Sequence, residues 1–147
     1  MKSQQLIARS PIPQEDLLGC GVACTAFVAQ KSYGDIRDYF DDEKVLHLGV
    51  YCTDIVRVLE VNNINYSFAK LNDDNMDLIE QDGVIIFISR SKTDPNGHWL
   101  VRWHGKYMDP WLNRNERCNL DVKAGLVDEL KSKPEWAVYP SCYKEVK

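Results

Sequence analysis

The stretch QEDLLGCGVACTAFVAQKSYG, Gln14 to Gly34, decides the fold expected for this chain. A short loop ends at Gly19, and from Cys20 small and apolar residues recur at the spacing of a largely buried helix that ends before Gly34. Cys20 would then lie at the helix N-terminus. Unpaired backbone N–H groups and the helix dipole favour a thiolate at that position.

The segments around this helix predict an α+β fold in which N-terminal helices pack on an antiparallel β-sheet. Residues 1–13 form a lead-in segment, since Pro11 and Pro13 favour extended backbone. His104-Gly105 is a good two-residue hairpin turn. Further helices are expected at 35–40, 53–63 (Thr53 as N-cap), 72–81 and 123–133, and strands at 64–71, 84–89, 98–103, 106–110 and 135–141.

Length and composition indicate one globular domain over residues 1–147. The chain is 44% hydrophobic and 27% charged, with a formal net charge of −4. No Lys/Arg run indicates nucleic-acid binding, and no apolar stretch has the length of a membrane span or of a signal-peptide core. We therefore expect a cytoplasmic protein. Its five cysteines, an odd number at irregular spacing, are expected to be mostly reduced.

Cys20 is a candidate nucleophile, although a free cysteine is often simply a small buried side chain. A nucleophilic thiol needs a base, and the chain has three histidines. His98 begins a predicted strand after a polar loop, which suits a working imidazole. His104 lies in the hairpin turn and is expected to be solvated, whereas the apolar neighbours of His47 suggest a half-buried side chain.

Two further residues complete the candidate site. Asp109 follows the next strand, so it would lie near His98 and orient the imidazole, although Asp-Pro also commonly starts a turn. The amide of Gln14 could help stabilise an oxyanion together with the backbone N–H of Cys20. The alternative is an ordinary solvated glutamine. Trp99 and Trp111 flank the predicted His-Asp pair, where they would wall a substrate groove or pack in the core.

The order and spacing of these residues resemble the C39 peptidases, a papain-like family that includes the leader-cleaving domains of bacteriocin exporters. The family has a glutamine six residues before the cysteine, and its motif continues through a helix to Tyr-Gly, as in Gln14, Cys20-Gly21-Val22-Ala23-Cys24 and Tyr33-Gly34. Gly97-His98-Trp99 and Asp109-Pro110 are similar to its later motifs. The stretch 49–64 resembles its second conserved helix, so the resemblance spans roughly residues 11–115.

The resemblance implies a papain-like fold and a cysteine peptidase that cleaves an amide bond in a peptide or protein, with no metal or organic cofactor. Cys20 would be the nucleophile, His98 the general base, Asp109 its orienting group and Gln14 part of the oxyanion hole. Two features depart from the family pattern. Gly19 stands where the family usually has aspartate, and the His98–Asp109 stretch is shorter than usual.

Three alternatives stay open at this point. The same triad would serve a deamidase or a transglutaminase-like effector or toxin, delivered by a dedicated secretion system. The fold would also serve a non-catalytic peptide-binding module. On paper, Cys20, Cys24, His47 and Cys52 could supply four zinc ligands, although a cysteine pair four residues apart on a helix is more often part of a core. Cys24 could also form a disulfide with Cys20 on oxidation.

Overall fold

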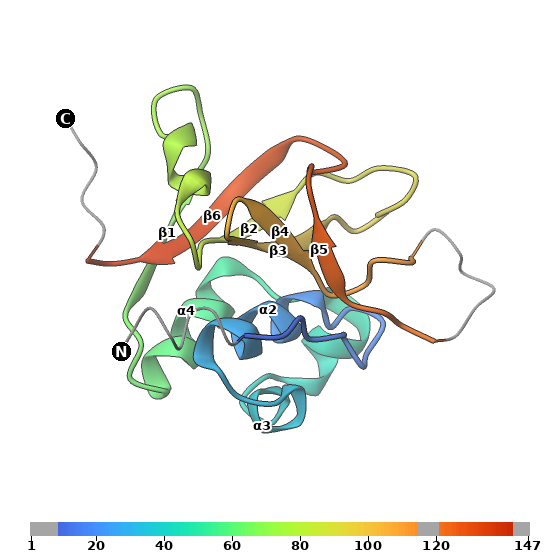
Figure 1. Ribbon diagram of the computed structural model, residues 1–147. Helices are drawn as coiled ribbons and strands as arrows, with labels where there is room; N and C mark the ends of the chain where they lie inside the picture. Colours follow the sequence, from blue (N-terminus) through green and yellow to red (C-terminus); the bar gives the residue numbers. More distant parts are fainter. Residues whose placement is uncertain (1–8, 115–120, 143–147) are drawn as a thin grey trace.

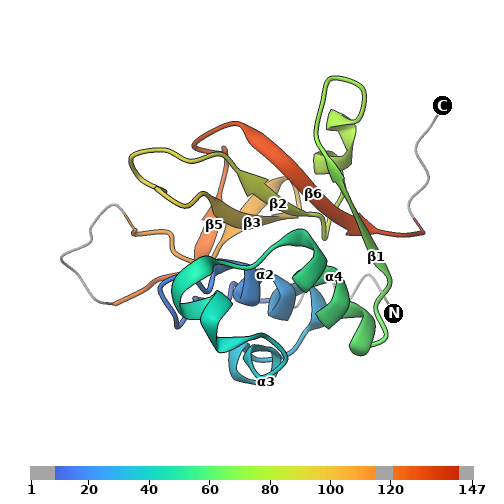
Figure 2. The same cartoon turned by 180° about the vertical axis from the view of Figure 1, so that it is seen from behind.

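The computed structural model of the protein describes residues 9–114 and 121–142. The helices lie together against one face of a six-stranded sheet, as the two opposite views in Figures 1 and 2 agree. The α-helices are α2 (Cys20–Ala29), α3 (Tyr33–Arg37) and α4 (Cys52–Val61), with a π-helical turn η1 (Lys44–Leu48) and a 3-10 turn η2 (Met76–Glu80). The strands are β1 (Tyr66–Lys70), β2 (Ile85–Ile88), β3 (His98–Trp103), β4 (Lys106–Asp109), β5 (Gly125–Val127) and β6 (Pro134–Pro140).

Helix α2 is central, and its sequence explains why. Every residue from Gly21 to Val28 is buried, because the helix lies between the sheet and its neighbouring helices. Small side chains allow this approach: a Cβ at Gly21 would overlap Val50. The helix ends where Gln30 adopts the left-handed conformation, with φ of 58°.

Helix α4 starts two residues earlier than expected. Its N-cap is Tyr51 rather than Thr53, and the helix begins at Cys52. Asp54 lies in the first turn as predicted, and its carboxylate accepts a 2.8 Å hydrogen bond from the backbone N–H of Tyr51. An acidic side chain at this position satisfies a free N–H group and complements the helix dipole.

The sheet has the order β1-β6-β2-β3-β4-β5, and every neighbouring pair is antiparallel. The hairpin β3–β4 closes through His104 and Gly105, whose φ angles of 51° and 77° are both positive. Two positive φ values are what the twist of a two-residue hairpin requires. The α+β class and the packing of helices on an antiparallel sheet, both predicted from the sequence, are therefore confirmed.

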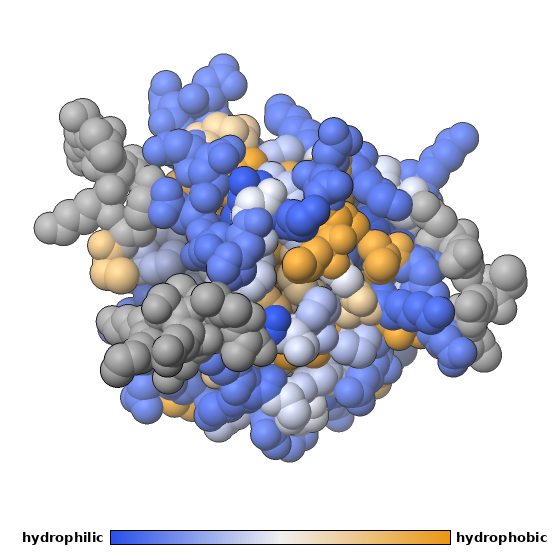
Figure 3. Space-filling view, viewed as in Figure 1, coloured by the Kyte–Doolittle hydropathy of each residue, from blue (hydrophilic) through white to orange (hydrophobic). Residues whose placement is uncertain are grey.

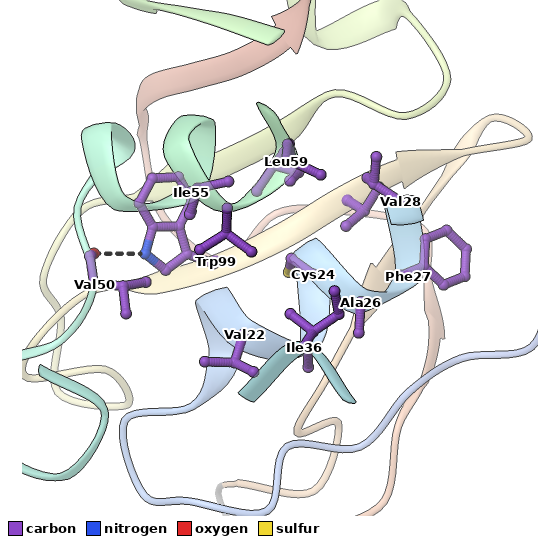
Figure 4. Close-up of a cluster of buried hydrophobic side chains, with 14 of the residues drawn as sticks. Val22, Cys24, Ala26, Phe27, Val28, Ile36, Val50, Ile55, Leu59 and Trp99 are labelled. Carbon is purple, nitrogen blue, oxygen red and sulfur yellow. Dashed lines mark hydrogen bonds between the residues drawn. The ribbon is translucent and has the colours of Figure 1, made fainter. Parts of the chain in front are cut away.

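The hydrophobic core occupies both faces of the sheet. On the helical face, Trp99, Val101 and Trp103 of β3 pack against α2 and α4, and Figure 4 shows Cys24 within this cluster. On the other face, Ile86 and Ile88 of β2 pack against Leu78 and Ile79 of η2, among others. The central strands are thus buried on both sides, which accounts for the continuous apolar run at 84–89.

Three predicted helices differ in the structure. The segment 123–133 is not a helix: it contains β5, because residues 125–127 pair with β4 and complete the sheet. The segment 72–81 forms only the 3-10 turn η2, after a turn in which Asn72 and Asn75 bond to backbone groups. Helix α3 begins at Tyr33 because the Ser32 hydroxyl caps it by accepting from the Asp35 N–H.

The surface in the view of Figure 3 is mostly hydrophilic, with small apolar areas between charged side chains. Within residues 9–114 and 121–142, no helix has the length and apolar character needed to cross a membrane.

Candidate active site

The β3–β4 hairpin brings His98 and Asp109 together. Val101 pairs with Met108, and His98 and Asp109 lie beyond this pair at the same end of the hairpin, three residues and one residue further along their strands, so they stand diagonally across it. The two side chains meet across this diagonal, with His98 Nε2 2.7 Å from Asp109 Oδ1. Both are almost fully buried, with side-chain exposures of 4% and 1%.

Cys20 completes this arrangement from the helical layer. Its thiol lies near the imidazole of His98, since interaction with Cys20 is among the causes that raise the pKa of His98. Because Asp109 occupies Nε2, the ring nitrogen left for Cys20 is Nδ1. Cys20 is partly exposed, whereas His98 is buried. The thiol is thus the member of the group that meets solvent.

The electrostatics favour a charged imidazole. Burial alone would lower the pKa of His98, but hydrogen bonds and charge from Asp109 and Cys20 raise it to about 9. Burial would likewise raise the pKa of Asp109, yet His98 and the Arg114 guanidinium lower it to about 2. Asp109 is therefore a carboxylate at neutral pH, and it stabilises an imidazolium.

Two residues that sequence reasoning missed lie behind Asp109. Arg114 Nη1 donates to Asp109 Oδ2 at 2.5 Å and to the Trp111 carbonyl at 3.0 Å. Its Nε and Nη2 donate to the two carboxylate oxygens of Asp94 at 2.5 and 3.0 Å. The sequence offered one signal for these two residues, which is that they lie close to predicted site residues: Asp94 comes four residues before His98, and Arg114 five residues after Asp109.

The start of α2 provides hydrogen-bond donors next to the thiol. Gly19 is the N-cap and has no side chain to cap the helix; the first backbone bond runs from the Ala23 N–H to the Gly19 carbonyl. The N–H groups of the first helical residues, beginning with Cys20, have no partner within the helix. Such groups are suited to bind an oxyanion that forms next to the Cys20 sulfur.

Gln14 lies at the same end of the hairpin, because its backbone N–H donates to the carbonyl of Pro110 at 3.2 Å. It is buried rather than solvated. Its Nε2 donates to the carbonyls of Asp16 and Leu17 at 2.9 and 3.0 Å, while Oε1 is buried with no partner among the described residues. The amide is therefore fixed in the loop before Cys20, and donation to an oxyanion would require exchange of one of these bonds.

Asp16 holds the loop that leads to Cys20. Its Oδ2 accepts from the Tyr33 hydroxyl at 2.6 Å and from Arg37 Nε at 3.0 Å, and its carbonyl accepts from the Gly19 N–H at 3.0 Å. Burial, followed by the bond to Asp16, raises the pKa of Tyr33 well above its ordinary value, so its hydroxyl stays a donor. The loop is thus fixed from helix α3.

Cys20 opens onto a cleft of about 690 Å³. The cleft runs between the segment that precedes α4 and the strands β1, β2 and β6. Its walls are largely apolar, with Arg90 and Glu135 as the charged side chains among those described. The apolar lining includes Leu18, Val50, Tyr51, Phe68, Trp99 and Trp136.

The two tryptophans expected near the site have different environments. Trp99 lines the cleft but is buried, and its Nε1 donates to the Val50 carbonyl at 3.3 Å, as Figure 4 shows. Trp111 is not among the residues that line this cleft. Its backbone N–H donates to Asp109 Oδ1 at 3.0 Å, so it contacts the site through the main chain.

The remaining cysteines and histidines differ from Cys20 and His98. The four cysteines in the described part of the chain are free, and Cys118 lies outside it. Burial raises the pKa of Cys24 well above its ordinary value and that of Cys52 to about 11. His104 is exposed as expected, but the prediction that His47 is half-buried was wrong, because the π-helical turn directs it to solvent.

A metal site is not assembled from the alternative set of ligands. Within residues 9–114 and 121–142, no three His, Cys, Asp or Glu side chains are grouped in a way that could hold a metal ion. Cys20, Cys24, His47 and Cys52 therefore do not form a zinc site here.

Comparison with known proteins gives no family assignment. No protein-family model matches the chain, and no curated protein is similar enough to count as a relative.

Proposed function

We propose that this protein is a cysteine peptidase of the C39-like type, built on a papain-like fold, that hydrolyses an amide bond in a peptide or protein. One observation carries the proposal: the buried imidazole of His98 is held by the Asp109 carboxylate at 2.7 Å and is close enough to the Cys20 thiol for Cys20 to raise its pKa. A partly exposed thiol, an imidazole and a buried orienting carboxylate in this order are the parts of a nucleophilic triad.

The chemistry assigned to each residue follows from its position. The Cys20 thiolate attacks the carbonyl carbon, and the backbone N–H of Cys20, with Gln14, stabilises the oxyanion. His98, charged by the thiol proton, returns that proton from Nδ1 to the leaving amine as the C–N bond breaks. Water then attacks the thioester with His98 as base, which releases the acid and regenerates the thiol. Asp109 keeps the ring oriented throughout.

The cleft beside Cys20 would bind the substrate chain. Its apolar walls suit hydrophobic side chains, and the aromatic rings of Phe68 and Trp136 lie 6.2 Å apart between centroids on one side of it. Apolar surface provides binding free energy, while backbone groups near Cys20 fix the scissile bond.

The first test is the rate at which iodoacetamide labels each cysteine as a function of pH, in the wild-type protein and in His98→Ala. At about pH 6, well below the usual thiol pKa of about 8.5, we expect Cys20 to react far faster than the other cysteines. Cys24 and Cys52 are internal controls, because burial raises both of their pKa values. The advantage of Cys20 should disappear in His98→Ala.

A second test uses a peptide library and reads the products by mass spectrometry, with Cys20→Ala as the inactive control. Cleaved peptides support the peptidase. A mass gain of one unit at glutamine or asparagine, or amine incorporation, would instead assign a deamidase or an acyl transferase. If Cys20 labels like an ordinary thiol and peptides bind without change, the protein is a peptide-binding module and the proposal is wrong.

A further inference from the structure

Arg114 lies behind the His98–Asp109 pair and is 2% exposed. We propose that Arg114 is a positioning residue for the reaction: it holds the Asp109 carboxylate with Oδ1 toward His98, and through Asp94 it ties this geometry to the loop that walls the cleft. This inference rests on the proposed function.

The two oxygens of Asp109 have separate partners. Oδ1 receives His98 Nε2 at 2.7 Å and the Trp111 N–H at 3.0 Å, whereas Oδ2 receives Arg114 Nη1 at 2.5 Å. Without Arg114, Oδ2 would be a buried oxygen with no donor among the described residues. Such a carboxylate takes up a proton or rotates to find a partner, and in both cases it stops supporting an imidazolium.

The orientation of Arg114 is itself fixed from the other side. Asp94 is buried and receives Nε and Nη2 in a bidentate ion pair. This planar two-point contact sets the direction of the guanidinium, and so leaves Nη1 for Asp109. Asp94 and Asp109 raise the pKa of Arg114 against the lowering by burial, so the group remains charged.

Asp94 also connects this network to the cleft. The Asp94 carbonyl accepts from the N–H groups of Ser91 and Gly97 at 2.9 Å each. The Asp94 N–H donates to the Ser91 hydroxyl at 3.1 Å. The loop closed by these bonds, 91–97, contains Asn96 and Gly97, which line the cleft, and it ends directly before His98. The ion pair between Asp94 and Arg114 therefore joins the loop before β3 to the turn after β4.

A buried ion pair with only a structural role makes a different prediction. Breaking it would reduce the free energy of unfolding, but it would leave the titration of His98 unchanged in the molecules that remain folded. The side chains that act on His98 are Cys20 from α2 and Asp109 from β4. Arg114 acts on Asp109, and Asp94 acts on Arg114. A positioning role therefore predicts a change in a pH profile.

The experiment measures the pH profile of Cys20 alkylation by iodoacetamide in folded protein, so that it needs no substrate. The variants are Arg114→Met, Arg114→Lys and Asp94→Asn. Arg57→Met is the matched control, because Arg57 is an exposed arginine on α4 outside this network. Far-ultraviolet circular dichroism and a thermal melt confirm that each variant is folded at the assay temperature.

In the wild type, we expect the alkylation rate of Cys20 to change near pH 9, where His98 loses its proton. This change is the alkaline limb of the pH profile. In Arg114→Met this limb should move to lower pH by about 1 unit or more, toward the usual histidine pKa of about 6.5. Asp94→Asn should move the limb in the same direction by less. Arg114→Lys should move it less than Arg114→Met does, because lysine keeps a positive charge near Asp109. Arg57→Met should match the wild type.

Two results overturn the inference. The first is a folded Arg114→Met with the wild-type limb. If Arg114→Met does not fold, Asp94→Asn and Arg114→Lys test the inference instead. The second result that overturns it is then a wild-type pH profile in both of these variants. Failure of the proposed function looks different, because Cys20 of the wild-type protein itself would then react as an ordinary thiol at low pH.

Discussion

The hydroxyl of Tyr33 occupies the space that a side chain on residue 19 would need. A Cβ at Gly19 would overlap the Tyr33 Oη and lie 3.1 Å from the Asp16 carbonyl. The φ of −92° at Gly19 is open to any residue, so the glycine is required for space and not for backbone conformation. The glycine at position 19 thus has a local steric cause.

Gly19→Ala should therefore lower the free energy of unfolding by about 1–3 kcal/mol, because the Tyr33 hydroxyl must leave its 2.6 Å bond to Asp16. Urea denaturation measures the change. The double variant Gly19→Ala/Tyr33→Phe removes the clashing oxygen, so it should lose less than the sum of the two single variants. Strictly additive losses would show that the clash is relieved elsewhere.

The stability of the protein should depend on pH through His98. Its pKa in the folded protein, about 9, lies above its ordinary value of 6.5. The folded state thus binds this proton more tightly, and the resulting stabilisation is complete below pH 6.5 and is lost as the pH rises to 9. The free energy of unfolding, measured by urea titration across this window, should fall less steeply in Asp109→Asn. Parallel slopes in both proteins would contradict the assignment.

The variant Gln14→Ala tests whether Gln14 donates a hydrogen bond to the oxyanion or only holds the loop before Cys20 in place. Alkylation of Cys20 by iodoacetamide forms no oxyanion, whereas amide hydrolysis does. We expect the variant to lower kcat for a peptide substrate by about 10²-fold while the alkylation rate of Cys20 changes little. Since Nε2 also holds the carbonyls of Asp16 and Leu17, a modest fall in Tm should accompany it. Equal losses in hydrolysis and alkylation would assign Gln14 to loop structure alone.

Phe68 gives a test of the cleft. It is 41% exposed on the edge strand β1 and lines the cleft with Trp136. Phe68→Ala should raise KM for peptide substrates by about 10-fold, with kcat and Cys20 alkylation near wild type, because it removes binding surface and leaves the triad untouched. The exposed Leu126 on β5 is outside the cleft, so Leu126→Ala is the matched control. If Leu126→Ala has the same effect, the cleft is not the substrate site.

The sequence was most informative where short-range rules act alone. The hairpin turn at His104-Gly105 fixes a register, and the register places His98 and Asp109 at the same end of the hairpin. The sequence was misleading at 123–133. The pattern there predicts a helix, but residues 125–127 pair with β4, a contact that local propensity does not describe. It was silent on Arg114 and Asp94, because Asp94-Pro95-Asn96-Gly97 has the composition of an ordinary turn, and an ion pair between residues twenty positions apart has no local signature.

The two-residue turn between β3 and β4 also determines where this protein can change in length. One residue added within 99–103 would shift His98 relative to Asp109, and residues added between His104 and Gly105 would replace the two-residue turn that fixes the register of β3 and β4. His104 is exposed at the far end of the hairpin from the triad. A label attached through the side chain at position 104, with no residue added to the backbone, would therefore leave the reacting groups at their present spacing.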